Sequence, residues 1–225
     1  EQPLEALMRA LTTPAPQNQG FLRRDAYLGV VLLTDEDDCS AENTDLFNPE
    51  NNSALGALTS FRCTEFGVVC DEPWNRNPQG TELYHNCVSR PDSDPQRMLY
   101  PIGRYTAFLS AIKDASRIIA SMVAGPYNGT LLVEPDANMN PQLADTCSTN
   151  ASQPAVRLQE FVDYFLPSPN DASWARTSIC DDDISPALTG ISTRLAAMVG
   201  TQCLAAVPAG CPDPAAAFGE PPLTA

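Results

Sequence analysis

The sequence has 225 residues and a mass of 24.2 kDa, enough for one large domain or two small ones. A hydrophobic fraction of 43% can fill a core, whereas 13 basic and 28 acidic residues give a net charge of −15. This charge repels nucleic-acid phosphates and anionic lipid, which excludes most roles on those surfaces and favours cationic partners or divalent metal ions. Because His85 is the only histidine, His-rich catalytic and metal sites are excluded as well.

Helical and strand patterns of apolar residues alternate along the chain. Leu4, Leu7, Met8 and Leu11 form one helical face, and the continuous apolar run up to Leu33 is typical of a strand buried on both sides. The predicted elements are, in order, a helix at Pro3–Leu11, a strand at Ala26–Leu33, a helix at Tyr105–Ile112, a strand at Arg117–Ala124, a helix at Leu158–Phe165, a strand at Trp174–Cys180 and a helix that begins near Asp183 or Ser185. The last helix is expected to bury a stripe made of Ile184, Leu188, Ile191, Leu195 and Met198.

This alternation predicts an α/β fold with a parallel sheet, flanking helices and right-handed crossovers. Three strands make a narrow sheet, and the most hydrophobic strand, Leu28–Leu33, would then have a bare edge that invites pairing with another chain. The sequence therefore has the features of the C-terminal half of a larger α/β domain. We expect this domain at residues 1–204, followed by a Pro- and Ala-rich tail at 205–225.

Eight cysteines are spread along the sequence at spacings that fit no zinc site. We expect four disulfides formed in an oxidising compartment; the alternative is a set of buried free thiols in a cytosolic protein, which the long polar loops around the cysteines disfavour. A polar, Cys-rich insertion at about 36–100 follows the first strand, and its cysteines can staple it. Proximity in sequence suggests the pairs Cys63–Cys70, Cys39–Cys87, Cys147–Cys180 and Cys203–Cys211.

The chain opens with Glu1, Gln2 and Pro3, without a Met or an apolar segment, and its apolar stretches are too short to cross a bilayer. We expect an exported protein at an extracellular, cell-surface or periplasmic location. Either its leader has been removed, or Glu1 marks an internal cut in a longer polypeptide.

The strand that ends at Leu33 and is followed by Thr34 and Asp35 resembles the fourth strand of a von Willebrand factor A (vWA) domain. The longer segment 21–40, FLRRDAYLGVVLLTDEDDCS, looks like a subgroup of that family found in secreted and surface-anchored bacterial proteins. The later helices and strands fall in the family's order, so the resemblance covers most of the ordered chain but not the insertion. It implies a vWA/Rossmann-like sheet of which this chain is the C-terminal half only.

The resemblance also implies a divalent cation at the carboxyl ends of the strands. In the family, the ion is held by an Asp-x-Ser-x-Ser motif after the first strand, by a Thr from a further loop and by the Asp after the fourth strand. Only the Asp after the fourth strand carries over to this sequence, onto Asp35. The Asp-x-Ser-x-Ser motif does not occur before the strand that ends at Leu33. Asp37 and Asp38 add carboxylates whose mutual repulsion a cation relieves, and an all-oxygen set suits Mg or Ca. The predicted metal ligands are thus Asp35, Asp37 and Asp38, and the alternative is an acidic turn without an ion.

The resemblance further implies a protein partner, a companion polypeptide that supplies the missing first strands. No catalytic residue is predicted: His85 lacks a Gly-x-Ser-x-Gly elbow, and the acidic run Asp181–Asp183 is expected to cap the following helix. The leading hypothesis is an exported, non-enzymatic adhesion or assembly module of vWA type. A purely structural subunit of a cell-surface or extracellular assembly, with no working metal site, is the alternative, and a metal-dependent hydrolase ranks third.

Overall fold

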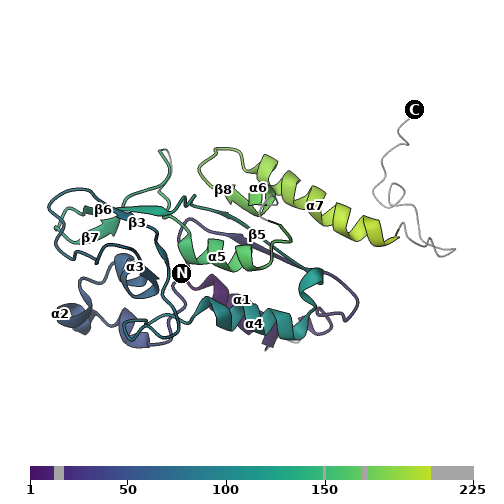
Figure 1. The fold of residues 1–225 in the computed structure, drawn as a ribbon, viewed down its shortest axis with the longest axis horizontal. Coiled ribbons are helices and arrows are strands. Elements are labelled where there is room, and N and C mark those ends of the chain that lie inside the picture. Colours follow the sequence, from purple (N-terminus) through teal and green to yellow (C-terminus); the bar gives the residue numbers. More distant parts are fainter. Residues whose placement is uncertain (13–17, 149–150, 169–171, 204–225) are drawn as a thin grey trace.

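A computed structural model describes residues 1–12, 18–148, 151–168 and 172–203 (Figure 1). The helices are α1 (Pro3–Thr12), α2 (Asn52–Leu55), α3 (Phe61–Gly67), α4 (Ile102–Ile112), α5 (Val156–Tyr164), α6 (Ala172–Ala175) and α7 (Ser185–Cys203), with short 3-10 turns at Thr44–Phe47, Pro49–Asn51 and Ala115–Arg117. The strands are β1 (Leu28–Leu33), β2 (Val68–Val69), β3 (Glu82–His85), β4 (Val88–Ser89), β5 (Ile118–Ala124), β6 (Thr130–Pro135), β7 (Pro141–Leu143) and β8 (Arg176–Ser178). None of the helices in these ranges is long and apolar enough to cross a membrane.

A three-stranded parallel sheet forms the centre of the fold, in the order β1-β5-β8. β1 pairs with β5 from Leu28 opposite Ile118 to Leu33 opposite Val123, and β5 pairs with the shorter β8. The predicted α/β class and parallel sheet are therefore confirmed. The third strand is shorter than predicted, because Trp174 lies in α6 and the strand begins only at Arg176.

Helices cover both faces of this sheet (Figure 1). On one face, Leu28, Val30 and Leu32 of β1 belong to a core shared with α1, α4 and α5. On the other face lies α7, whose Leu195 would stand 3.6 Å from a Cβ placed on Gly29. The alternate side chains of β1 therefore meet different surroundings, buried on the α1/α4/α5 face and exposed on the α7 face. The prediction that this strand is buried on both sides is thus wrong, because the described part of α7 leaves Val31 and Leu33 exposed.

The polar insertion is more ordered than the sequence pattern indicates. It contains α3 and the short strands β2, β3 and β4, and β3 joins β6 and β7 of the following segment in a second, antiparallel sheet (Figure 1). This part has its own core, in which Phe61, Tyr84 and Val133 are buried. Strands of two to six residues that pair across some 50 residues of sequence leave too short a periodic signal to be recognised locally.

Three disulfides join Cys39 to Cys63, Cys70 to Cys87 and Cys147 to Cys180. The last pair is as predicted, whereas the predicted pairs Cys63–Cys70 and Cys39–Cys87 are wrong. The segment between Cys63 and Cys70 is not a hairpin, because Cys63 lies in α3 and Cys70 follows β2.

Strand register explains one of the corrected pairs. β2 and β4 are antiparallel with Val68 opposite Ser89 and Val69 opposite Val88, so the next position places Cys70 beside Cys87. The predicted pair of Cys203 with Cys211 lies outside the described residues, as does the tail at 205–225.

Helix α7 follows the acidic run as predicted. The Asp183 carboxylate accepts a hydrogen bond from the Ser185 amide (2.9 Å) and so caps the start of the helix. The Ser185 hydroxyl, followed by this amide, holds the pKa of Asp183 below its usual value. Ile191 is buried, but Leu188 is 45% exposed, so the expected buried stripe is wrong at that position. The Met198 side chain lies outside the described part of the chain.

Candidate functional site at the carboxyl end of β1

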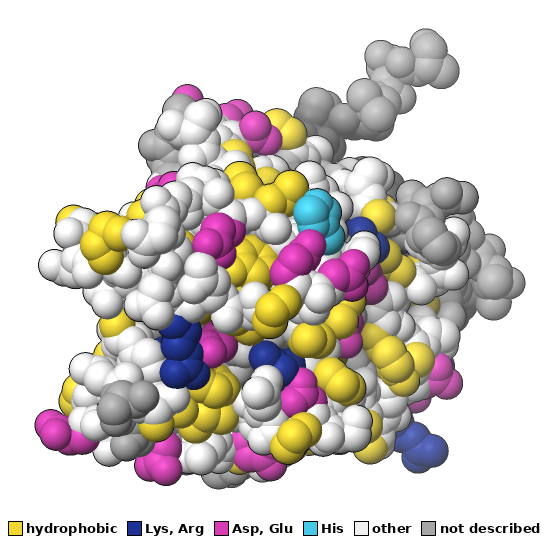
Figure 2. Space-filling model, turned by 60° about the vertical axis from the view of Figure 1, so that its left-hand side comes forward, with side chains coloured by type: hydrophobic (Ala, Val, Ile, Leu, Met, Phe, Trp, Pro, Cys, Tyr) yellow, Lys and Arg dark blue, Asp and Glu magenta, His cyan; other side chains and the backbone are white. Residues whose placement is uncertain are grey.

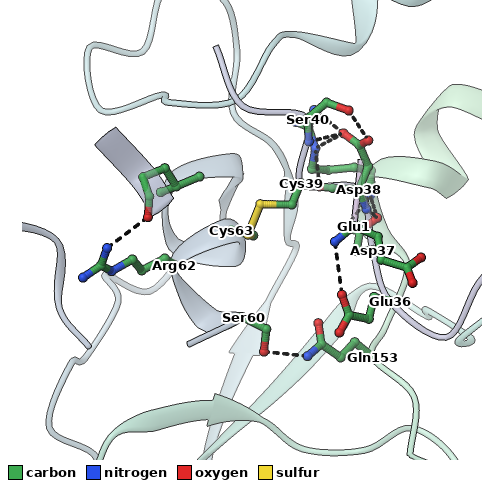
Figure 3. Close-up of a disulfide and its surroundings, with 12 residues drawn as sticks. Glu1, Glu36, Asp37, Asp38, Cys39, Ser40, Ser60, Arg62, Cys63 and Gln153 are labelled. Carbon is green, nitrogen blue, oxygen red and sulfur yellow. Dashed lines mark hydrogen bonds and ion pairs between the residues drawn. A yellow bond between two sulfur atoms is a disulfide. The ribbon is translucent and has the colours of Figure 1, made fainter. Parts of the chain in front are cut away.

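The acidic segment that the sequence singles out follows β1 directly. Figure 3 shows its residues Glu36, Asp37 and Asp38 next to the N-terminal Glu1 and the Cys39–Cys63 disulfide. The segment around Gln153 crosses this end of the sheet, because the Gln153 amide donates to the Asp35 carbonyl (2.7 Å) and the Ala155 amide donates to the Gly125 carbonyl (3.0 Å). A Cβ on Gly125 would lie 1.9 Å from the Gln153 carbonyl oxygen, so this close crossing requires glycine. The crossing segment brings the start of α5 to the acidic turn.

Asp38 is fully buried in an ion pair with Arg157 of α5. Its Oδ2 lies 3.0 Å from Nη2 of Arg157, and the two side chains are 0% and 1% exposed. Oδ1 accepts hydrogen bonds from the Ser40 hydroxyl (2.6 Å) and from the Leu4 amide (3.2 Å). Every acceptor face of this carboxylate is thus occupied by donors of the protein itself, and its charge is neutralised.

The rest of the Arg157 guanidinium binds backbone carbonyls. Nε donates to the carbonyl oxygen of Asp38 (3.1 Å), Nη2 to that of Tyr100 (2.7 Å) and Nη1 to that of Gly67 (3.4 Å). One side chain therefore ties the acidic turn to the insertion and to the start of α4. This is a structural role, because a buried guanidinium with all these acceptors holds the segments together.

Asp37 caps helix α5 from a distant part of the sequence. Its carboxylate accepts the amides of Arg157 (3.0 Å) and Leu158 (3.1 Å), the first free donors of the helix, and also the amide of Asp38 (2.8 Å). Burial raises the pKa of Asp37 to about 6, and these donors together with the Arg157 charge oppose the shift. The side chain is partly buried and engaged with the helix terminus.

Asp35 alone among the predicted ligands is exposed, and its carboxylate forms no hydrogen bond or ion pair with the described residues. Within those residues, no three His, Cys, Asp or Glu side chains come together in a way that could hold a metal ion. A Ca²⁺ ion takes about six to eight oxygen ligands. The described residues therefore do not fit a divalent cation without further ligands, and the predicted ligand set stays a prediction.

The edge of β1 that faces away from β5 has no strand beside it in the described part of the chain. The Thr34 amide donates to Val123 of β5, so the alternation of a parallel ladder turns the backbone groups of Gly29, Val31 and Leu33 toward this open edge. The side chains at this edge are apolar and exposed, 46% for Val31 and 58% for Leu33. Unpaired backbone groups and exposed apolar side chains thus coincide on one strand.

The single histidine, His85, lies on the surface of the second sheet (Figure 2). Its Nδ1 is 2.6 Å from Oε1 of Glu72, and Glu72 also accepts the His85 amide (2.7 Å), which lowers the pKa of Glu72. Both side chains are about half exposed. The pair joins β3 to the preceding loop.

Sequence reasoning missed the buried arginines, of which Arg157 is central to the site. The Arg62 guanidinium donates to the carbonyl oxygens of Leu46 (2.9 Å) and Asn48 (3.0 Å) and so organises the loop after β1. A signal was present for Arg157, which stands four residues before Phe161 on the apolar stripe of α5. A charged residue at such a position indicates a buried partner.

Comparison of the chain with family models, with curated proteins and with solved structures gave no match. The function is therefore inferred from the geometry at the carboxyl end and open edge of β1.

Proposed function

We propose that this chain is an exported, non-enzymatic module of vWA type that serves adhesion or assembly by taking a strand of another polypeptide onto β1. The open edge of β1 carries the proposal, because its backbone groups and its apolar side chains Val31 and Leu33 are both available. Proteins that keep an edge strand unpaired commonly protect it with Lys, Pro or a bulge. β1 has the sequence LGVVLL and contains neither Lys nor Pro.

Two further observations support the proposal. The parallel order β1-β5-β8 agrees with the order in which the vWA resemblance arranges the corresponding strands. Three disulfides support folding in an oxidising compartment, as expected for an extracellular, cell-surface or periplasmic protein. The added strand comes from a companion polypeptide, as the resemblance implies, or from a second copy of this chain.

In this proposal, a divalent cation binds only when the added strand is in place. Asp35 is the one exposed carboxylate of the predicted set, whereas Asp37 caps α5 and Asp38 is paired with Arg157. Any other ligands would have to come with the added strand. We therefore expect calorimetric titration of the chain alone with CaCl₂ or MgCl₂ to show no site. In a complex with a companion polypeptide that brings such ligands, replacement of Asp35 by Ala should abolish any sensitivity of the complex to EDTA.

Native mass spectrometry of the unreduced chain tests strand addition. We expect a complex with a second polypeptide that is lost in Val31→Lys, because a charge at the centre of the edge opposes burial. The matched control is Val88→Lys in β4, since Val88 is also an exposed valine (53%) but lies outside the parallel sheet. A chain that binds neither a second copy of itself nor another polypeptide, or a complex that survives Val31→Lys, contradicts the proposal.

A further inference from the structure

We propose that the strand taken by β1 belongs to a second copy of this chain, paired antiparallel about a two-fold axis at Val31. The inference rests on the proposed strand addition at the same edge and specifies its occupant. Three independent features of β1 and its flanks are self-complementary in this arrangement: the backbone register, the side-chain sizes and the charges at the two ends of the strand.

The backbone register allows a symmetric pairing. Gly29, Val31 and Leu33 direct their N–H and C=O groups toward the open edge, so a two-fold axis at Val31 places Val31 opposite its own copy and Gly29 opposite Leu33. In an antiparallel ladder each such pair exchanges two hydrogen bonds. All the backbone groups that β1 leaves open are then satisfied, and the two three-stranded sheets become one continuous sheet.

Side-chain sizes match in the same register. Leu33 is the most exposed side chain of β1, and it would stand opposite Gly29, which has no side chain. Gly29 also borders a hollow of about 300 Å³ whose lining includes Phe21, Leu22, Arg23 and Lys113. The leucine of each copy therefore faces the glycine of the other, while the two Val31 side chains pack against each other at the axis.

Charges at the ends of β1 decide between an antiparallel and a parallel pairing. Exposed Arg23 and Arg24 precede the strand and form no ion pair with the described residues, so together with exposed Asp25 this end keeps a net positive charge. Exposed Asp35 follows the strand, and so does Glu36, which is already paired with the N-terminal ammonium of Glu1 (3.2 Å). Antiparallel pairing brings the basic end of each copy to the acidic end of the other, and this occurs twice in the dimer. Parallel pairing would place like charges together. Because the net charge of −15 opposes association of two copies in general, these local attractions determine the geometry in which they meet.

The oligomeric state of the full, unreduced chain tests the inference. Light scattering coupled to size-exclusion chromatography is expected to give twice the chain mass of 24.2 kDa for the wild type and for Val88→Lys, and the single chain mass for Val31→Lys. A dimer that persists in Val31→Lys would place the interface elsewhere and overturn the inference.

A charge-exchange experiment tests the antiparallel register. One variant carries Arg23→Glu and Arg24→Glu, and the other carries Asp35→Lys and Glu36→Lys. Each alone places like charges at both ends of an antiparallel interface and is expected to weaken self-association at least tenfold, whereas a parallel interface already has like charges together and would not be weakened. Mixed together, the variants should form a heterodimer, which shows that both still fold and associate. Self-association of either variant that is as strong as that of the wild type contradicts the antiparallel arrangement.

Hydrogen exchange separates failure of this inference from failure of the proposed function. Slow exchange at the amides of Gly29, Val31 and Leu33 is expected in the dimer. Both proposals are refuted if the chain is a monomer and these amides exchange fast under all conditions, including in the presence of the proteins secreted by the producing cells. A monomer whose edge amides become protected only in a complex with a different polypeptide overturns the second copy but preserves strand addition.

Discussion

The substitution Arg157→Met is expected to be among the most damaging single changes in this protein, although it removes no catalytic or ligand-binding group. It leaves the Asp38 carboxylate, which is 0% exposed, without its counter-ion and with only the Leu4 and Ser40 donors. The carbonyl oxygen of Tyr100 loses its guanidinium donor as well. Breaking a buried pair from one side costs about 3–5 kcal/mol, a large part of the roughly 5–15 kcal/mol that stabilise a typical domain.

Urea unfolding with the disulfides intact, followed by tryptophan fluorescence at pH 7, measures this loss. The matched control is Arg176→Met, which breaks the partly exposed pair with Asp163 and is expected to cost about 0–1 kcal/mol. A loss for Arg157→Met that is no larger than that of the control refutes the reasoning. The double variant Arg157→Met/Asp38→Asn should be more stable than Arg157→Met alone, because no net charge then remains buried. If Arg157→Met is not recovered folded, the free energy of unfolding of the double variant is compared with that of the wild type instead.

Two further changes test the same end of the sheet. Because burial raises the pKa of Asp37 to about 6, between pH 4 and 6 the folded state holds a proton that the unfolded state has released. The free energy of unfolding therefore falls as the pH rises through this range, by up to about 3 kcal/mol. Asp37→Asn should remove this part of the pH dependence in unfolding curves measured across the range. A slope unchanged in the variant argues against the raised pKa. Gly125→Ala forces a Cβ against the Gln153 carbonyl and should cost about 1–3 kcal/mol in thermal unfolding, whereas Gly103→Ala, where a Cβ meets nothing within 4 Å, should be neutral or stabilising. Equal melting temperatures for the two alanine variants would mean that the crossing segment adjusts without cost.

Elements with a long periodic pattern were predictable from the sequence. The helical spacing of Leu158, Phe161 and Val162 gives helix α5 directly, since burial on one helix face imposes a period on the sequence. The continuous apolar run of β1 gives the strand, although its alternating burial is not visible in that run. The parallel sheet followed from strands that are apolar on both faces and separated by helices. The second sheet was not predictable, because β3, β6 and β7 are short and assemble only by pairing with one another.

The disulfide pairs illustrate the same limit. Proximity in sequence favoured Cys63 with Cys70, but α3 separates them, and the register of β2 against β4 places Cys70 beside Cys87. Cys63 is instead bonded to Cys39 after β1. Cysteine count and spacing established that disulfides form, whereas the pairing depends on strand register and helix direction.

The acidic turn shows most clearly what sequence and tertiary structure each decided. The sequence by itself determined that Asp35, Asp37 and Asp38 follow a buried strand and so gather at the carboxyl end of the sheet. Only the tertiary structure gave each carboxylate a different role, because the donors come from α5, about 120 residues later: its amides bind Asp37, its Arg157 neutralises Asp38, and Asp35 stays exposed. A local pattern specifies which face of an element is buried, but the neutralisation of a buried charge depends on groups that meet only when distant segments pack together.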